Sequence, residues 1–388
     1  MKPNWALLFV CLSARALYLP TKIRIRQWGW LPSDRGPTVL ITNHQHMDEG
    51  ENVIRRLFFR DPWKRIVMVN SRRTFETGFF AARLPWTAPF TRKLNLTKLW
   101  LGFGIYPVEN HLHARSLTSL AEEIRSAHGD IALDDVLAPE TLAKLGLTGR
   151  RLDELWTPQH FASAQTTIKL SHLREPYRSE AIANFRATLA SDVATVVEAV
   201  RDDGTLYVTP EGDFSRDGRM HRMRAGMVDP MLPFAEPWLC AIAYDPFRGR
   251  RLSMLYRIVR PADPTDFGTS RAAARPVTTS ALLSTFLLEA PMPFTLADAT
   301  RAVRRQIDAL PAGVFVDPEL FAAPEAVTAE AAALLVARGT LAPDGAGYRL
   351  TERRGDARFP HVADMVTFQR NMLEETLATA QRLATAPA

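Results

Sequence analysis

The alternation of short strand-like segments with longer helical ones over residues 21–262 constrains the fold of this chain more than any other feature. The clearest strands are TVLIT at 38–42 and TLYVT at 205–209, and helical patterns separate the strand candidates. Such alternation predicts an α/β fold in which helices flank a mostly parallel sheet. Functional loops of such sheets gather at one edge, so we look for chemistry in the loops that follow strands.

The 388 residues are enough for further domains around this sheet. We expect an apolar N-terminal helix at 1–20, the sheet-containing domain at 21–262 and a small, mainly helical C-terminal domain at 280–388. Residues 111–177 are rich in Leu and Ala and predict a helical insertion within the sheet-containing domain. Residues 261–277 contain many turn-forming residues, so we expect a linker there.

The formal net charge of +6 favours anionic partners, namely phosphorylated substrates, acidic lipid surfaces or nucleic acid. The helix, glycine and hairpin pattern at 326–352 is also found in winged-helix modules. A DNA-reading helix needs basic side chains, whereas EAVTAEAAALLVAR at 325–338 offers only Arg338. We therefore expect no nucleic-acid partner and a small helical accessory domain instead.

Cysteine usage excludes two further classes of site. The two cysteines, Cys11 and Cys240, do not form a Cys-x-x-Cys motif. The sequence therefore predicts neither a disulfide framework nor a structural metal site.

Residues 5–20 are mostly apolar but form a shorter run than the roughly 20 residues that a bilayer crossing needs. We favour an interfacial helix here, and the alternatives are a signal segment and a helix docked on the core. The aromatic residues Trp86, Phe90, Trp100 and Phe103 could also contact lipid. We therefore expect a peripheral or monotopic protein at the cytoplasmic face of a membrane.

Polar residues cluster at 43–49, directly after the first clear strand, and a helix is expected over 52–59. His44 precedes Asp48 by four positions and Glu49 by five. A carboxylate at such a spacing can bind one imidazole nitrogen and fix the tautomer, which leaves the other nitrogen to take a proton. The pattern predicts a base with an orienting carboxylate, and the alternative is a polar helix cap.

A second polar loop, PEGDFSRDGR at 210–219, follows the strand at 205–209. Gly212 and Gly218 permit a close approach of the backbone to a ligand. Positive charge that suits phosphate is concentrated here in Arg216, Arg219, Arg222 and Arg224. The alternative is a surface turn with solvated arginines.

In this order, these elements resemble the glycerolipid acyltransferase family typified by 1-acylglycerol-3-phosphate acyltransferases. That family has N-H-x-x-x-x-D after its first core strand and F-P-E-G-T-R-S after a later strand. The matching segments are TVLITNHQHMDE at 38–49, GIYPVEN at 104–110 and VTPEGDFSRDGR at 208–219, and WLCAIAYDP at 238–246 is similar to the fourth block. The resemblance covers residues 20–260 apart from the insertion.

The resemblance implies a glycerolipid acyltransferase-like α/β fold and an O-acyltransferase activity in phospholipid biosynthesis. A fatty acyl group would move from the co-substrate, acyl-CoA or acyl carrier protein, to a hydroxyl of a lysophospholipid or related glycerolipid, without a cofactor or metal. His44 would be the general base, and backbone amides near Gly212 would bind the oxyanion. The residues assigned to substrate binding are Glu211, Gly212, Ser215, Arg216, Arg219 and Asn110.

The first block departs from the family pattern in the carboxylate that would orient His44. Asp48 keeps the family's residue type but lies one position early, whereas Glu49 keeps the spacing with a longer side chain. We favour Asp48 and keep Glu49 as the alternative.

Two other departures concern the acceptor's phosphate. Asn110 and Phe214 stand where the family has arginines, and Arg216 or Arg219 could compensate for them. A different headgroup on the acceptor is equally compatible with the sequence. The alternative function is a catalytically degenerate acyltransferase-like protein that binds lipid or a protein partner.

Overall fold

The computed structural model describes most of the chain. The described residues are 23–32, 36–46, 49–79, 81, 85–92, 94–108 and 114–385. The helix expected at 1–20 and the site candidates Asp48 and Asn110 lie outside them. Among the described residues, no helix is both long enough and apolar enough to cross a membrane.

A seven-stranded sheet organises the fold. Its strands are β1 (Ile23–Trp28), β2 (Thr38–Thr42), β3 (Arg65–Ser71), β4 (Ile105–Val108), β7 (Gly204–Val208), β8 (Glu236–Asp245) and β9 (Leu252–Val259), in the order β1-β9-β8-β2-β7-β3-β4. β8 and β9 are antiparallel, whereas β1 and β9, β2 and β8, β2 and β7, and β3 and β4 pair in parallel. The predicted α/β class and mostly parallel sheet are confirmed.

The chain forms two compact units. Residues 1–66 and 200–388 belong to the first unit, and residues 67–199 belong to the second. The first unit therefore combines both polar loops identified in the sequence with the whole C-terminal part of the chain.

Strands β2 and β7 of the first unit are buried along their whole length. A parallel strand that is covered on both faces needs a continuous run of apolar or β-branched residues, which TVLIT and GTLYV provide. The two strands pair directly, with Thr38 opposite Thr205 and Ile41 opposite Val208. Their carboxyl ends therefore release the two polar loops side by side.

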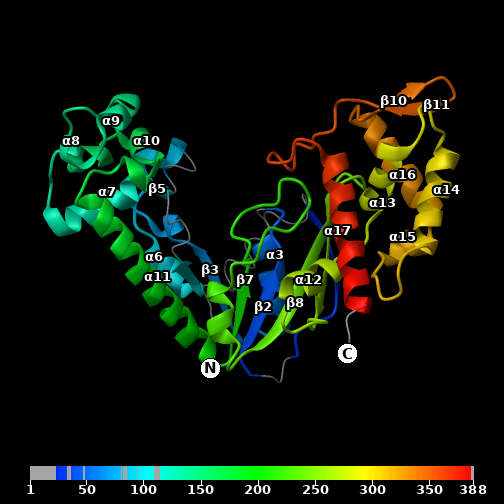
Figure 1. Ribbon diagram of the computed structural model, residues 1–388, viewed down its shortest axis with the longest axis horizontal. Helices are drawn as coiled ribbons and strands as arrows, with labels where there is room; N and C mark the ends of the chain where they lie inside the picture. The colour runs from blue at the N-terminus through cyan, green and yellow to red at the C-terminus, as the bar shows by residue number, and fades with distance from the viewer. Residues whose placement is uncertain are drawn as a thin grey trace. The chain divides into compact units, whose positions relative to one another are not determined.

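The remaining elements of the first unit are mostly helices. They are α3 (Glu49–Arg60), α12 (Phe267–Ala273), α13 (Thr279–Glu289), α14 (Leu296–Asp308), α15 (Pro318–Ala322), α16 (Pro324–Ala337) and α17 (Met365–Thr385), with the hairpin strands β10 (Leu341–Asp344) and β11 (Gly347–Leu350). The C-terminal helix α17 packs along α12 and α13, as the red helix in Figure 1 shows.

Helix α12 lies where a linker was expected at 261–277, and that prediction was wrong. Asp266 is the N-cap of the helix, because its carboxylate accepts a hydrogen bond from the Thr269 amide at 2.9 Å. Sequence alone suggested a turn because Asp serves both in turns and at helix N-caps. The helix places Arg271 at a fully buried position, and Arg275, two residues after the helix ends, is also fully buried.

Arg275 joins α12 to α17 and to the second polar loop. Its guanidinium donates to the Glu375 carboxylate at 2.6 Å, to the Met372 carbonyl at 3.0 Å and to the Gly218 carbonyl at 3.2 Å. Burial lowers the pKa of Arg275, and the Glu375 carboxylate opposes that shift. The C-terminal helix and the loop around Gly218 are therefore held by the same buried cation.

The C-terminal part has the order α13, α14, α15, α16 and then the β10–β11 hairpin. Phe294, between α13 and α14, exchanges two backbone hydrogen bonds with Tyr348 of β11, at 3.0 and 2.8 Å. On α16, the Glu330 carboxylate accepts a hydrogen bond from Arg248 at 3.2 Å. These contacts fasten the helices and hairpin to each other and to the turn after β8.

The second unit contains the segment that the sequence marks as an insertion. Its helices are α5 (Ala88–Thr91), α6 (Thr97–Gly102), α7 (Leu117–His128), α8 (Leu133–Val136), α9 (Pro139–Leu145), α10 (Phe161–Ala164) and α11 (Tyr177–Arg201), and β5 (Ala114–Ser116) pairs with β6 (Thr167–Lys169). Leu120, Leu133, Leu152 and Leu155 are fully buried in a core formed by this segment. The Leu-rich composition therefore supports a separate helical core.

Gly218 tests the docking of the second polar loop on α17. Its φ is +90°, and an added Cβ would lie 2.0 Å from the Phe368 carbonyl oxygen. Gly218→Ala should therefore lower the free energy of unfolding by about 2 kcal/mol or more. Gly226→Ala is the matched control, because an added Cβ there meets nothing within 4 Å, and its effect should stay below about 0.5 kcal/mol. Denaturant unfolding measures both, and equal stability of the two variants would contradict the docked loop.

Candidate functional site

The candidate site begins where β2 ends. The Asn43 side chain donates to the Ile242 carbonyl at 2.9 Å and accepts from the Ile242 amide at 2.8 Å. The Thr42 hydroxyl donates to the Cys240 carbonyl at 2.8 Å. These bonds to β8 fix the backbone immediately before His44, so that the following loop leaves the sheet in a defined direction.

The His44 side chain is held by a buried carboxylate. Its Nδ1 lies 2.9 Å from Oε2 of Glu49, whose side chain is fully buried. Oε1 of Glu49 accepts the backbone amides of Gln45 and His46, both at 2.9 Å. Among the described residues, Glu49, at the family spacing, is the carboxylate that contacts His44, and the favoured Asp48 lies outside the described residues.

Glu49 can hold His44 because α3 begins at Glu49, rather than at Asn52 as the sequence suggested. A carboxylate at a helix N-terminus is stabilised by the unpaired amides and the helix dipole. Burial raises the pKa of Glu49, while the hydrogen bond from His44 and its charge oppose that shift.

The geometry sets which nitrogen of His44 can act. An ionised carboxylate only accepts hydrogen bonds, so when Glu49 is ionised the hydrogen bond between the two side chains requires the proton on Nδ1 of His44. Nε2 is then the nitrogen with a free lone pair, and the His44 side chain is 23% exposed. A proton acceptor of this kind is accessible to a substrate.

The two polar loops meet at His44, as the sequence predicts. The Ser215 amide donates to the His44 carbonyl at 3.1 Å. The Phe214 ring packs on the His44 ring, with the centroids 4.2 Å apart. The first and third blocks of the resemblance therefore form one site, although they lie far apart in the sequence.

Glu211 is fixed beneath the second loop by a buried ion pair. One carboxylate oxygen accepts the His221 amide at 2.9 Å, and the other lies 3.0 Å from Nη2 of Arg271. Nη1 of Arg271 donates to the Thr42 carbonyl at 2.8 Å. Burial lowers the pKa of Arg271, and the charge of Glu211 opposes this shift.

Sequence reasoning missed Arg271, because it lies in the segment interpreted as a linker. The available signal was an Asp that caps an Ala-rich helix, with one arginine inside the helix and another just after it. The guanidinium of Arg271 contacts the end of β2 and the second loop together, so it holds the two polar loops in register.

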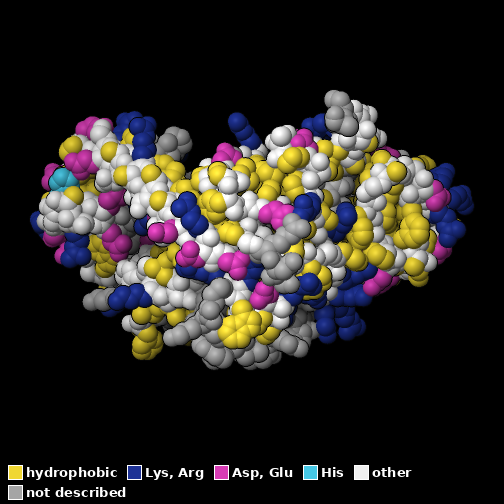
Figure 2. Space-filling view, turned by 90° about the horizontal axis from the view of Figure 1, so that it is seen from below, with side chains coloured by type: hydrophobic (Ala, Val, Ile, Leu, Met, Phe, Trp, Pro, Cys, Tyr) yellow, Lys and Arg dark blue, Asp and Glu magenta, His cyan; other side chains and the backbone are white. Residues whose placement is uncertain are grey.

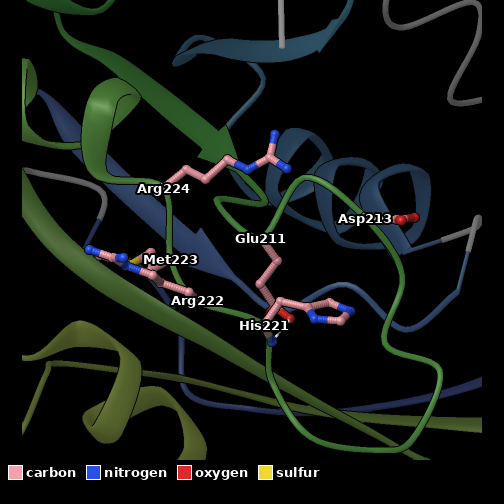
Figure 3. Close-up of a pocket in the computed structure, with 6 residues that line it drawn as sticks. All are labelled: Glu211, Asp213, His221, Arg222, Met223 and Arg224. Carbon is pink, nitrogen blue, oxygen red and sulfur yellow. Dashed lines mark hydrogen bonds between the residues drawn. The ribbon is translucent and has the colours of Figure 1, made fainter. Parts of the chain in front are cut away.

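An open pocket of about 680 Å³ lies against the second loop. The two ends of this loop meet at the hydrogen bond from the Arg224 amide to the Pro210 carbonyl, which is 2.8 Å long. The lining residues are Glu211, Asp213, His221, Arg222, Met223 and Arg224. Figure 3 shows Glu211 beside His221, with the two arginine side chains reaching out separately. The pocket therefore combines the fixed carboxylate of Glu211 and the carboxylate of Asp213 with two arginine side chains.

Two of the predicted substrate-binding residues have structural partners. The Gly212 amide donates to the Thr209 carbonyl at 3.2 Å, while the oxyanion role of backbone amides near Gly212 stays a prediction. The Ser215 hydroxyl donates to the Arg219 carbonyl at 2.7 Å and accepts the Gly218 amide at 3.0 Å. Both groups shape the loop. Gly212 still matters, because its φ of +74° lets Arg224 pack closely over it.

The two arginines favoured from the sequence differ in their surroundings. Arg219 pairs with Glu374 of α17 at 3.1 Å, and both side chains are largely exposed. Arg216 is exposed on the loop. Neither lines the pocket, whose two arginine side chains are Arg222 and Arg224, a few residues further along the chain.

Among the described residues, no group of His, Cys, Asp and Glu side chains could hold a metal ion. The site therefore consists of a histidine, two buried carboxylates and arginines.

Comparison with known proteins adds no assignment. No protein-family model matches the sequence, and no curated protein is significantly similar to it.

The Arg271–Glu211 pair should dominate the stability of the site. Arg271→Ala leaves a buried carboxylate without its cation, and should lower the free energy of unfolding by about 3 to 5 kcal/mol. Arg219→Ala is the matched control, since it breaks the exposed pair with Glu374 and should cost less than about 1 kcal/mol. Denaturant unfolding of Arg271→Met, Glu211→Gln and the variant that combines them completes the test. Independent, additive effects of these two changes would refute direct pairing.

Proposed function

We propose that this chain is an O-acyltransferase of the glycerolipid acyltransferase type. It transfers a fatty acyl group from an acyl thioester, acyl-CoA or acyl carrier protein, to a hydroxyl of a lysophospholipid or related glycerolipid. The observation that carries the proposal is the His44–Glu49 pair, 2.9 Å apart, with the imidazole partly exposed beside the second loop. A base of this kind serves a reaction in which a hydroxyl must lose its proton.

The reaction follows from the orientation of His44. Nε2 takes the proton of the acceptor hydroxyl while its oxygen attacks the thioester carbonyl. Glu49 stabilises the imidazolium that forms. The tetrahedral intermediate collapses, the carbon–sulfur bond breaks, and the thiolate takes the proton from His44. The products are an ester and a free thiol, and no covalent acyl-enzyme is needed.

The pocket beside the site suits an anionic headgroup. Arg222 and Arg224 supply positive charge next to the carboxylate of Glu211, which Arg271 and the His221 amide hold in place. Arginine binds phosphate oxygens well because its guanidinium offers several donors in one plane. These two arginines therefore take the role that the sequence suggested for Arg216 or Arg219.

The protein is proposed to act at the cytoplasmic surface of a membrane, because acyl chains and lysolipids partition into lipid. In the second unit Trp86 and Phe90 are 79% and 87% exposed, which favours contact with lipid, whereas Phe103 is buried at 8% and cannot take part. Figure 2 shows one face of the protein, on which apolar side chains lie among both basic and acidic side chains.

A second candidate function is a lipid-binding or partner-binding protein without turnover. Phe214 favours it, because this ring packs on His44 at a position where the family has an arginine. The same site would then bind an acylated ligand without reacting.

Substitutions at the base separate these functions. His44→Ala should lower acyl transfer by about 100- to 10,000-fold, because the hydroxyl loses its proton acceptor. Glu49→Gln should lower it by about 100-fold or more, since the imidazolium loses its partner. Asp48→Asn is the control and should leave the rate nearly unchanged. Transfer of radiolabelled acyl groups by the purified full chain measures all three, with thermal unfolding to verify folding.

Acceptor choice tests the pocket. A panel of lysophospholipids, glycerol 3-phosphate and uncharged alcohols should show that phosphate-bearing acceptors react fastest. Arg222→Ala and Arg224→Ala should each raise KM for such acceptors about tenfold or more. Arg250→Ala, an exposed residue on the turn after β8, is the control. No turnover with any acceptor, combined with binding of lysolipid, would favour the second candidate function.

A further inference from the structure

The segment between β11 and α17 contributes to the site, although it lies outside the part of the chain that resembles acyltransferases. Phe359 is fully buried, and its ring centroid is 5.2 Å from that of His46. Nε2 of His46 is within hydrogen-bond distance, 3.2 Å, of the Arg358 carbonyl. The first polar loop therefore packs directly against this C-terminal segment.

The segment is firmly anchored. The Asp356 carboxylate accepts hydrogen bonds from Arg338 at 2.8 Å and from Arg358 at 2.6 Å. Arg358 also donates to the Pro246 carbonyl at 2.6 Å, just after β8. A segment fixed to the sheet in this way can hold a side chain at a defined place beside the site.

That side chain is His361. Its ring stacks on Phe214, with centroids 5.1 Å apart and planes at 28°, and Phe214 packs on His44 at 4.2 Å. The three rings therefore form a row that runs from the proposed base to the C-terminal segment. The strength of ring packing of this kind depends on ring orientation.

The surroundings of His361 favour an uncharged ring. Burial lowers the pKa of His361, and the charges of His44 and Arg216 act in the same direction, while the Gln45 backbone and Asp213 oppose them. An uncharged imidazole can stack on Phe214 without bringing a second positive charge toward His44.

We propose that His361 is a positioning residue of the transfer site: its ring clamps Phe214 against the His44 ring and so fixes the direction in which Nε2 of His44 points. The role rests on the proposed function of His44 as the base. The C-terminal part of the chain then supplies one wall of the site rather than a separate accessory function.

The contacts explain why an arginine is absent at position 214. An arginine there would replace the middle ring of the row and would place a permanent charge between two histidines. Phe214 instead joins the first loop, the second loop and the C-terminal segment by ring contacts. Phosphate binding is then left to the pocket arginines.

The test compares His361→Phe, which keeps an aromatic ring, with His361→Ala and His361→Gln, which do not. The first readout is the proton resonance of the His44 imidazole, assigned by its loss in His44→Ala, in the full-length protein. The ring current of Phe214 shifts this resonance, so Phe214→Leu gives its value without the ring. We expect His361→Ala and His361→Gln to move it toward the Phe214→Leu value, and His361→Phe to leave it in place.

The second readout is acyl transfer. His361→Ala and His361→Gln should lower kcat about tenfold with little change in KM, and His361→Phe should retain most of the wild-type kcat. The clamp would be overturned if the His44 resonance were unchanged in the two ring-free variants. It would also be overturned if the resonance moved to the Phe214→Leu value in His361→Phe. If no variant and no wild-type protein transfers acyl groups, the proposed function fails, while the resonance still decides on the clamp.

Discussion

The buried contact of Arg271 with Glu211 and the Thr42 carbonyl is the interaction on which the site depends. Thr42 ends the central strand β2, and His44 follows it by two residues. Glu211 belongs to the loop after the neighbouring strand β7. The guanidinium thus adds to the β2–β7 pairing and to the hydrogen bond from the Ser215 amide to the His44 carbonyl, which also hold the two loops together. The proposed chemistry requires that relative position of the loops.

Two buried arginines, Arg271 on α12 and Arg275 just after it, hold this arrangement together. Removing an arginine and a carboxylate from water is costly, and the charge attraction between Arg271 and Glu211 opposes that cost, although the facing atoms Nη2 and Oε1 lie 3.0 Å apart without hydrogen-bond geometry. Arg271 meets one loop and the sheet, while Arg275 meets the second loop and α17. Helix α12 and the residues directly after it therefore link the two polar loops with the C-terminal helix.

The sequence predicts the sheet and part of the site, because these depend on local patterns. The runs TVLIT and TLYVT are recognisable as buried strands, and His44 with a nearby carboxylate is recognisable as a base and its partner. The choice between Asp48 and Glu49 depends on where α3 begins, and propensities do not determine a helix start to the residue. Glu49 occupies the first position of α3, where its carboxylate accepts two backbone amides.

The contributions of Arg271 and His361 could not be predicted from the sequence for a different reason. Each acts through contacts with residues far away along the chain, such as Arg271 with Thr42 and His361 with Phe214. Neither belongs to a motif with a fixed spacing. Burial on α12 and ring stacking from the C-terminal segment become visible only when the tertiary contacts are known.

The central claim is that Glu49 holds His44 in the tautomer that leaves Nε2 able to take a proton. The most direct measurement is the ¹⁵N chemical shift of both His44 ring nitrogens in the full chain near neutral pH, assigned by loss in His44→Ala. We predict a protonated Nδ1 and an unprotonated Nε2, with the preference lost in Glu49→Gln. A neutral ring that carries its proton on Nε2 in the wild-type protein would contradict the account, since that nitrogen could not accept a proton from a hydroxyl.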